Sequence, residues 1–388
     1  MRSRLTIAAA VMTAVLAALT PAAGQTTAQR SMHHDFRVVT VAEGLVHPWS
    51  IAFLPGGDML ITERPGRLRI VRNGRLLENP VQGVPAVLFR GQGGLLEVLP
   101  HPNFAQNRLL YLTYSKPVTD SAGTTAVARG RFENDRLTDV QDIFVADTRP
   151  GAAHYGSRLA FDRNGYLFIT VGDRAVPPRD SLEAHPAQDL TNHHGKVIRL
   201  HDDGRVPADN PFVSREGAKP EIFSYGHRNM QGLVIHPESG DIWITEHGPQ
   251  GGDEVNLVKP GANYGWPVVG YGVNYRSGTS IHSGTTREGM EPPGFVWVPS
   301  IGASGLLLYT GDKFPEWRGS LFAGGMVGEQ LVRLTFNGQR PELAEILVRR
   351  QGRIRDVRQG PDGYIYLAID NRQGGQTPVV RLEPALRN

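Results

Sequence analysis

One pattern recurs six times along the chain: a small or polar residue, an apolar triplet, a turn rich in Gly or Pro, and then an alternating β-type run. The six copies are WSIAFLPGGDMLITE from Trp49, GGLLEVLPHPNFAQNRLLYLTY from Gly93, SRLAFDRNGYLFITVGD from Ser157, QGLVIHPESGDIWITEHG from Gln231, SGLLLYTGDKFPEWRGSLFAGG from Ser304 and RDVRQGPDGYIYLAIDN from Arg355. Sheets of about four short strands, repeated at intervals of about 40 to 75 residues, are typical of β-propeller blades. The sequence therefore predicts an all-β, six-bladed β-propeller with four-stranded antiparallel blades.

Composition also favours β structure that is rich in turns. The 388 residues include 46 Gly and 28 Pro, spread along the chain instead of clustered, and this distribution indicates many tight turns between short strands. Gly57, Gly165 and Gly363 occupy the same place in their repeats, just before a β-rich run. Because no Ser/Gly linker or break in composition divides the repeats, we expect one domain, from residue 38 to residue 383.

A lone strand-like run, FRVVTVA at Phe36, precedes the first repeat. We expect it to pair with the last blade beside VVRL at Val379, because this pairing would close the ring and cover a sheet edge. A frayed N-terminal arm is the alternative. Residues 25–37 are interpreted as a linker ahead of the propeller.

The N-terminus combines two arginines, an apolar run from Leu5 to Leu19 and a small-residue segment that ends at Gly24. These features are typical of a cleaved signal peptide, here residues 1–24. The apolar run is short for a membrane span, so an uncleaved anchor is the less favoured alternative. We expect a periplasmic or secreted mature protein without stable membrane insertion, and the lack of Cys fits export.

The formal net charge of the chain is only +3, and the sequence contains no run of Lys and Arg of the kind that binds the phosphates of a nucleic acid. Proteins that bind nucleic acid usually carry such a run or a strongly basic face. Nucleic acid is therefore not an expected partner, and any basic patch must be local.

In a propeller, the innermost strand of each blade lines the central channel. The residues just ahead of each apolar triplet should therefore meet at one mouth of this channel: His47, Gln92, His154, Arg228 with Asn229, Gly302, and Arg353 with Arg355. This set holds three arginines and two histidines but no Asp or Glu. Because Arg binds carboxylates in a bidentate manner, the mouth is expected to attract an anion with several carboxylates.

Each of these residues also has a purely structural interpretation. Arg353 and Arg355 alternate on one strand and could pair with Asp356 or Asp362, and His47 could cap a turn. The shared position in successive repeats favours the channel mouth for the group as a whole.

The segment EHGPQGGDEVNL adds a candidate metal site. Its possible ligands are the backbone carbonyls of the Gly248-Pro249 turn, the carboxylates of Asp253 and Glu254, and oxygens of Asn263 or Tyr264. Such hard oxygen ligands suit Ca²⁺, although no Asp-rich calcium loop is present. The aromatic residues Tyr264, Trp266 and Tyr271 are interpreted as packing residues and not as a sugar-stacking platform.

His154, in HYGSR, is the candidate general base, because neutral imidazole accepts a hydroxyl proton near neutral pH. Its position just before an innermost strand would direct it to the same mouth. His193 and His194, in TNHHGK, are the competing pair, and we expect them in a solvated loop.

Together these residues resemble the soluble aldose and glucose dehydrogenases that depend on pyrroloquinoline quinone, a family of six-bladed propellers. The resemblance spans nearly the whole mature chain and rests on six motifs in the same order: GQGGLL at Gly91, GSRLAF at Gly156, GHRNMQGL at Gly226, EHGPQGGDEVN at Glu246, NYGWP at Asn263 and GRIRDVRQGPDGYIY at Gly352.

The resemblance implies a role for each matching residue. The implied quinone-binding positions are Gln92, Arg228, Asn229, Arg353 and Arg355. It further implies His154 as the catalytic base, Gly248 and Pro249 as the carbonyl ligands of an active-site Ca²⁺, and Glu254 and Tyr264 as part of a structural Ca²⁺ site. The implied reaction is oxidation of an aldose to a lactone by hydride transfer to Ca²⁺-bound quinone, with electrons passed on to an acceptor that the sequence does not identify.

One motif departs from the family. Glucose-specific relatives place a lysine beside the cofactor in the blade that here reads LFAGGMVGEQL, where Gly325, Met326 and Val327 stand instead. Quinone affinity and substrate preference are therefore in doubt. Two other functions stay open: a Ca²⁺-dependent propeller lactonase or hydrolase, and a non-catalytic propeller that binds carbohydrate or protein.

Overall fold

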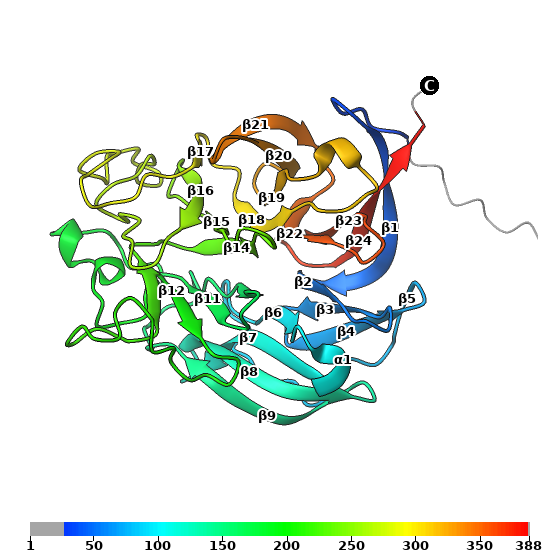
Figure 1. Ribbon diagram of the computed structural model, residues 1–388, viewed down its shortest axis with the longest axis horizontal. Helices are drawn as coiled ribbons and strands as arrows, with labels where there is room; N and C mark the ends of the chain where they lie inside the picture. Colours follow the sequence, from blue (N-terminus) through cyan, green and yellow to red (C-terminus); the bar gives the residue numbers. More distant parts are fainter. Residues whose placement is uncertain (1–26, 387–388) are drawn as a thin grey trace, which may run out of the picture.

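Six four-stranded antiparallel sheets surround a common axis in the computed structural model, which describes residues 27–386 (Figure 1). The predicted all-β, six-bladed propeller is thus confirmed. The predicted signal peptide, residues 1–24, lies outside the described residues. The first strand begins at Asp35 and the last ends at Ala385, slightly beyond the predicted limits of 38 and 383.

The blades follow one another in chain order, each with its strands ordered from the axis outward. The first three blades are β2 (Pro48–Phe53), β3 (Met59–Glu63), β4 (Arg67–Arg72) and β5 (Arg75–Leu76); β6 (Leu95–Pro100), β7 (Leu109–Pro117), β8 (Gly123–Glu133) and β9 (Arg136–Val145); and β10 (Leu159–Phe161), β11 (Leu167–Val171), β12 (Lys196–Leu200) and β13 (Ile222–Tyr225). The next two are β14 (Met230–Ile235), β15 (Ile242–Glu246), β16 (Asp253–Val258) and β17 (Phe295–Trp297); and β18 (Ala303–Leu308), β19 (Leu321–Gly325), β20 (Gln330–Asn337) and β21 (Arg340–Leu347).

The sixth blade is built from both ends of the chain. It contains β22 (Arg353–Gln359), β23 (Ile365–Asp370), β24 (Gln376–Ala385) and, on the outside, β1 (Asp35–Val46). β1 runs antiparallel to β24, with Val38 opposite Leu382. This pairing confirms the predicted closure of the ring, which leaves the last blade without an open edge.

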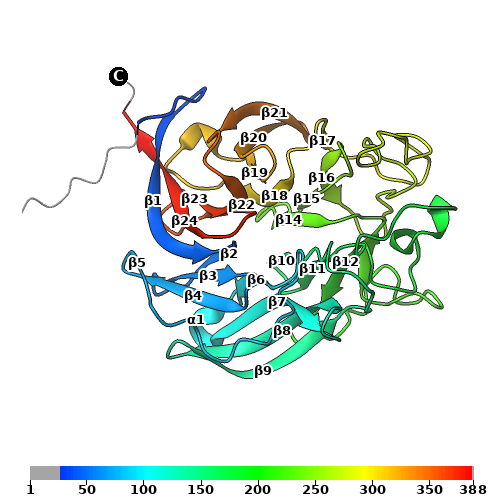
Figure 2. The same ribbon diagram turned by 180° about the vertical axis from the view of Figure 1, so that it is seen from behind.

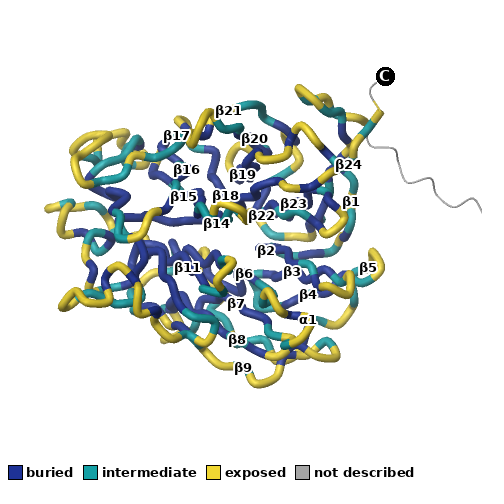
Figure 3. Tube along the Cα trace, in the orientation of Figure 1, coloured by how far each residue is buried: buried dark blue, intermediate teal, exposed yellow. Residues whose placement is uncertain are grey.

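The second strands of the blades are almost entirely buried because a neighbouring blade covers each face of the sheet. Every residue of β3, β11 and β15 is buried, which explains their nearly continuous apolar sequences. Figure 2 shows the innermost strands gathered around the axis from the other side. In Figure 3 most of the strands near the axis are buried, and most of the exposed residues lie in loops at the periphery.

The turn glycines predicted from the repeats have the expected backbone. Gly57, Gly165 and Gly363 have φ values of +91°, +82° and +82°, a region that only glycine adopts without strain. Each lies in the hairpin that joins the innermost strand of its blade to the second.

Two long connections project from one side of the ring (Figure 1). One joins β11 to β12 and carries the short 3₁₀ turns η1 (Leu182–Ala184) and η2 (Pro186–Gln188); the other joins β16 to β17. The other helical segments are α1 (Phe104–Asn107) and η3 (Pro315–Trp317), and within residues 27–386 no helix has the length and apolar character needed to span a membrane.

Candidate functional site

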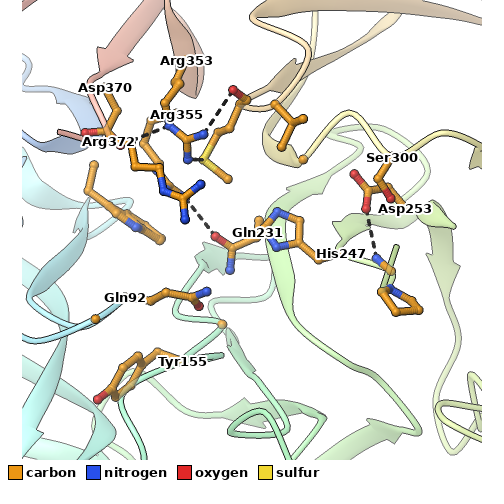
Figure 4. A pocket seen from close by; sticks show the side chains of 18 of the residues that line it. Gln92, Tyr155, Gln231, His247, Asp253, Ser300, Arg353, Arg355, Asp370 and Arg372 are labelled. Carbon is orange, nitrogen blue, oxygen red and sulfur yellow. Dashed lines mark hydrogen bonds and ion pairs between the residues drawn. The ribbon is translucent and has the colours of Figure 1, made fainter. Parts of the chain in front are cut away.

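A cavity of about 780 Å³ lies at one mouth of the central channel (Figure 4). Residues at the beginnings of the innermost strands line it, as the repeat pattern predicts: His47, Gln92, Gly302, Arg353 and Arg355. In Figure 4, Arg353, Arg355, Asp370 and Arg372 form one side, Gln92 and Tyr155 a second, and His247, Asp253 and Ser300 a third. Residues distant in the sequence therefore converge on one site.

Further lining residues come from the ends of the second strands, which the repeat analysis missed. Arg64 follows β3, His247 follows β15, Met326 follows β19 and Asp370 ends β23. In an antiparallel pair the end of one strand lies beside the beginning of the other, as where Asp370 pairs with Arg353. These lining residues could have been predicted from the sequence by also considering the position at or just after the end of each second strand of the repeat.

The cavity contains carboxylates, so the expectation of a mouth without Asp or Glu is wrong. Asp370 accepts a hydrogen bond from His47 Nδ1 at 2.9 Å and lies 3.8 Å from Nε of Arg353. The suggested partners Asp356 and Asp362 pair with other arginines. The repeat analysis missed Asp370 because it considered only the beginnings of the innermost strands, whereas Asp370 ends β23, the second strand of its blade.

Even with Asp370 present, the cavity has an excess of positive charge. Arg355 is buried and donates to Oε1 of Gln231 at 3.1 Å, but the buried Nε atoms of both Arg353 and Arg355 have no hydrogen-bond partner among the described residues. Burial and the neighbouring cations, Arg64 first among them, lower the pKa of Arg355 to about 9. Unpaired buried N–H groups and mutual repulsion indicate a site built for an anion.

His154 lies directly beside the cavity, although it is not one of the lining residues. Its backbone N–H donates to Oε1 of Gln92 at 2.9 Å, and the next two residues, Tyr155 and Gly156, line the cavity. Nδ1 of His154 lies 2.6 Å from Oδ1 of the buried Asp173. This contact places the ring proton on Nδ1 and leaves Nε2 as the basic atom.

The surroundings of His154 keep its imidazole neutral. Burial lowers the pKa of His154 below its usual value of 6.5, opposed by the charge of Asp173 and supported by that of Arg228. Asp173 itself is held by Nε1 of Trp266 at 2.7 Å. Asp173 was missed because it follows the second strand of its blade, at the start of a long loop, whereas the repeat analysis used only the innermost strands.

Arg228 and Asn229 lie behind the cavity wall. The segment His247–Pro249 lines both the large cavity and a second one of about 20 Å³, and Arg228 lines only the second. The Arg228 guanidinium donates to the carbonyl of Gly248 at 2.6 Å. Asn229 lines neither cavity; its Oδ1 accepts from the backbone N–H of Gly156 at 3.2 Å and ties the wall to the His154 loop.

The Gly248-Pro249 turn, predicted as part of a metal site, is held in place by hydrogen bonds to neighbouring side chains. Asp253, proposed as a metal ligand, instead accepts backbone N–H groups with both oxygens, from Gly248 at 3.0 Å and from Ala303 at 2.8 Å. The side-chain oxygen of Asn263 likewise accepts from Gly265 and Gln188. Asp253 therefore shapes the turn, because each of its two oxygens accepts a backbone N–H group.

Glu254 and Tyr264 line the small cavity together with Glu246. Oε2 of Glu254 and Oε1 of Glu246 accept from the same Asn256 amide at 3.1 and 2.9 Å. Burial and the charge of Glu246 raise the pKa of Glu254 to about 8. Two neighbouring carboxylates that share one amide donor indicate a position for a cation.

Deeper in the channel, acidic side chains are fully neutralised. Glu97 and Asp356 form ion pairs with Arg158 at 3.1 and 2.9 Å, and both also pair with Arg358. Within residues 27–386, no three His, Asp or Glu side chains are grouped to hold a metal. The axis thus lacks the free carboxylates that a Ca²⁺-dependent hydrolase of this architecture would need.

The expectation of a solvated loop for His193 and His194 is wrong. His193 is only 4% exposed and lies between Asp147 and Glu221, at 2.8 and 2.7 Å. His194 is buried, and its Nε2 has no partner among the described residues. Burial, assisted by the charge of Lys196, lowers the pKa of His194 to about 4.

We expect His194 to make the protein sensitive to acid. Between pH 6.5 and 4 the unfolded chain binds a proton at this residue that the folded chain does not, so the free energy of unfolding falls as the pH is lowered. A shift of this size corresponds to roughly 3 kcal/mol. Denaturant unfolding at about pH 7 and about pH 4.5 should show a smaller loss of unfolding free energy for His194→Gln than for the wild type or for the half-buried control His236→Gln. Equal losses in the three proteins would contradict this prediction.

The fold and the site define a six-bladed propeller with a cationic cavity at one end of its axis and a His-Asp pair beside it. The chain belongs to the glucose/sorbosone dehydrogenase family, whose model matches residues 45–381.

Individual relatives agree with this family. The chain is 44% identical over 344 residues to aldose sugar dehydrogenase YliI of Escherichia coli, covering 87% of this chain and 91% of that protein. The apo crystal structure of the soluble aldose sugar dehydrogenase of Escherichia coli matches with a TM-score of 0.84 and 41% identity, covering 90% of this chain and 100% of the other. A quinone-bound aldose sugar dehydrogenase from Streptomyces coelicolor matches with a TM-score of 0.72 and 27% identity, covering 90% and 98%.

Proposed function

We propose that the protein oxidises aldose sugars to lactones with pyrroloquinoline quinone and Ca²⁺ as cofactors. The observation that carries this proposal is the buried Arg355 with the half-buried Arg353 beside it. Their Nε atoms are buried without a hydrogen-bond partner among the described residues, at a cavity next to the His154-Asp173 pair. Membership of the family and the quinone-bound relative support the same conclusion.

The residues present fit the quinone. The volume of about 780 Å³ lies within the range of small-molecule sites, and the cofactor has three carboxylates for the arginines to bind. Arg353, Arg355 and Gln92 would hold it from the lining of the large cavity, with Arg64 as an additional cation. Arg64 and the Arg353 guanidinium, which donates to the backbone carbonyl of Met326, supply positive charge near the place where relatives have a lysine.

The chain itself supplies the base and its orientation. Nε2 of His154 would accept the proton of the anomeric hydroxyl, while Asp173 holds Nδ1–H and stabilises the imidazolium that forms. When bound, the quinone supplies a two-electron acceptor and Ca²⁺ a Lewis acid. The acceptor that reoxidises the cofactor is not identified by the residues described above.

The oxygen donors fit Ca²⁺ in two places to different degrees. Gly248 and Pro249 line the large cavity, and the Gly248 carbonyl oxygen already accepts from Arg228, so a cation there would have to share it. Glu254, with Glu246 and Tyr264, offers hard oxygens around a cavity large enough for one ion. We therefore propose Glu254 and Tyr264 as the structural site, and Gly248 and Pro249 as the site beside the quinone.

Calcium should stabilise the protein through Glu254. At a concentration roughly 100 times its dissociation constant, Ca²⁺ should raise the melting temperature of the wild type by about 4 °C. Glu254→Gln should lose most of this increase, because it removes one carboxylate of the pair, whereas the exposed control Glu238→Gln should retain it. Differential scanning calorimetry with and without Ca²⁺ measures the effect; an undiminished increase in Glu254→Gln would exclude this residue as a ligand.

The proposed function is tested by two measurements on the purified protein. Absorbance titration should show quinone binding that is tighter in the presence of Ca²⁺, and the reconstituted protein should reduce a dye when aldoses are added. Absence of quinone binding would favour the non-catalytic propeller, and lactone hydrolysis without quinone would favour the hydrolase. The N-terminal sequence supports a periplasmic or secreted site of action, which fractionation of cells would test.

A further inference from the structure

The loop that carries His154 has an unusual backbone. His154, Gly156 and Ser157 have φ values of +51°, +64° and +84°. The left-handed region is unfavourable for residues other than glycine, and such backbones persist only when the surrounding structure holds them in place. Something outside the loop must therefore restrain it.

Arg174 provides these restraints. Its Nη1 donates to the carbonyl of Ala153 at 2.7 Å, and its Nη2 donates to the carbonyls of Gly151 at 2.7 Å and Gly123 at 3.0 Å. The guanidinium also lies 3.7 Å from the centre of the Tyr155 ring. Arg174 is only 3% exposed, so these contacts are protected from water and strengthened by burial.

The neighbour of Arg174 in the chain holds the imidazole of the same histidine. Asp173 accepts from Nδ1 of His154, and the backbone N–H of Arg174 donates to the His154 carbonyl at 3.3 Å. Two consecutive residues thus hold both the ring and the backbone of His154. A guanidinium is suited to this task because its planar fork reaches several acceptors at once.

We propose that Arg174 is a positioning residue for His154: its guanidinium holds the backbone of residues 151–155, so that the imidazole keeps the one orientation in which Asp173 holds Nδ1. The catalytic consequence rests on the proposed function, whereas the positioning of the ring does not.

The charge of Arg174 acts on His154 as well. The groups that face the imidazole are Asp173, whose charge raises the pKa of His154, and Arg228 and Arg174, whose charges lower it. On the far side, His247 is close enough to interact electrostatically with His154. Removal of the Arg174 charge should therefore raise the pKa of His154, whereas replacement by Lys should change the geometry and retain the charge.

Two variants separate these effects. In Arg174→Lys, kcat of the reconstituted enzyme should fall about 10- to 100-fold because the base is misplaced, while KM and the quinone dissociation constant change less than about twofold. In Arg174→Met, kcat should fall similarly and the acid limb of the pH profile should move to higher pH. The matched control is Arg163→Lys, an arginine that donates to the Glu238 carbonyl at the surface.

A second readout does not need the cofactor. The His154 imidazole can be titrated by NMR in the apo protein, with its signals assigned by comparison with a His154→Ala variant. In Arg174→Met the pKa of His154 should be higher than in the wild type. In Arg174→Lys the pKa should be close to the wild-type value, but the chemical shifts of the ring should change. Wild-type values in both variants would overturn the proposal. If the wild type binds no quinone, the proposed function fails while this titration still decides the role of Arg174. Should Arg174→Met not fold, Tyr155→Leu, which removes the ring beneath the guanidinium, must alter the His154 ring shifts for the proposal to stand.

Discussion

Replacing His154 by Ala should lower kcat by about 10²- to 10⁴-fold, the usual contribution of a general base. Quinone affinity should change little, because His154 lies beside the cavity and is not one of its lining residues. Stopped-flow reduction of the bound quinone by an aldose measures the chemical step, and an absorbance titration measures binding.

The contrast with a neighbouring histidine sharpens this experiment. His47 lines the cavity but donates to Asp370, which is also near Arg353. His47→Ala should therefore weaken quinone binding more than it slows proton removal. Turnover retained in His154→Ala would mean that another group acts as the base, and His247, whose buried Nε2 is unpartnered among the described residues, would be the next residue to replace.

Replacing Arg355 by Ala should weaken quinone binding on the order of 100-fold or more, because the loss of one partner of a buried charge pair typically costs 2 to 5 kcal/mol (about 30- to 5,000-fold). The apo protein should respond differently. Since burial and neighbouring arginines lower the pKa of Arg355 to about 9, its charge is unfavourable in the absence of an anion. The melting temperature of apo Arg355→Ala should therefore equal or exceed that of the wild type.

The opposite signs of these two effects make the result diagnostic. Arg349→Ala, an exposed arginine of the preceding connection, is the control and should alter neither quantity. A clear loss of apo stability together with unchanged quinone affinity would show that Arg355 has a structural role and does not bind the cofactor.

The repeat predicted more of the site than any single motif did. Of the eight residues that it placed at one mouth, five line the cavity: His47, Gln92, Gly302, Arg353 and Arg355. The other three, His154, Arg228 and Asn229, lie beside or behind its wall. This success has a simple cause: the position of a residue within a blade depends on local strand geometry, which recurs in every repeat.

The same reasoning failed where contacts cross between elements. Asp370 neutralises part of the cationic mouth, and Asp173 holds His154 from the start of a long loop between β11 and β12. His193 is buried between Asp147 and Glu221, not solvated. No periodic pattern encodes these pairings, because each depends on the distance between two segments that fold independently of one another.

The amino-acid sequence by itself determined the number of blades, the strand that closes the ring and the end of the channel at which the arginines gather. Hydrophobic periodicity and turn residues act over a few residues, so they can be recognised without coordinates. Only the tertiary structure decided which charges are paired, which nitrogen of His154 is free and which arginine nitrogens lack a hydrogen-bond partner among the described residues. Those properties arise from distances of a few ångströms between side chains of different blades, and they set the chemistry of the site.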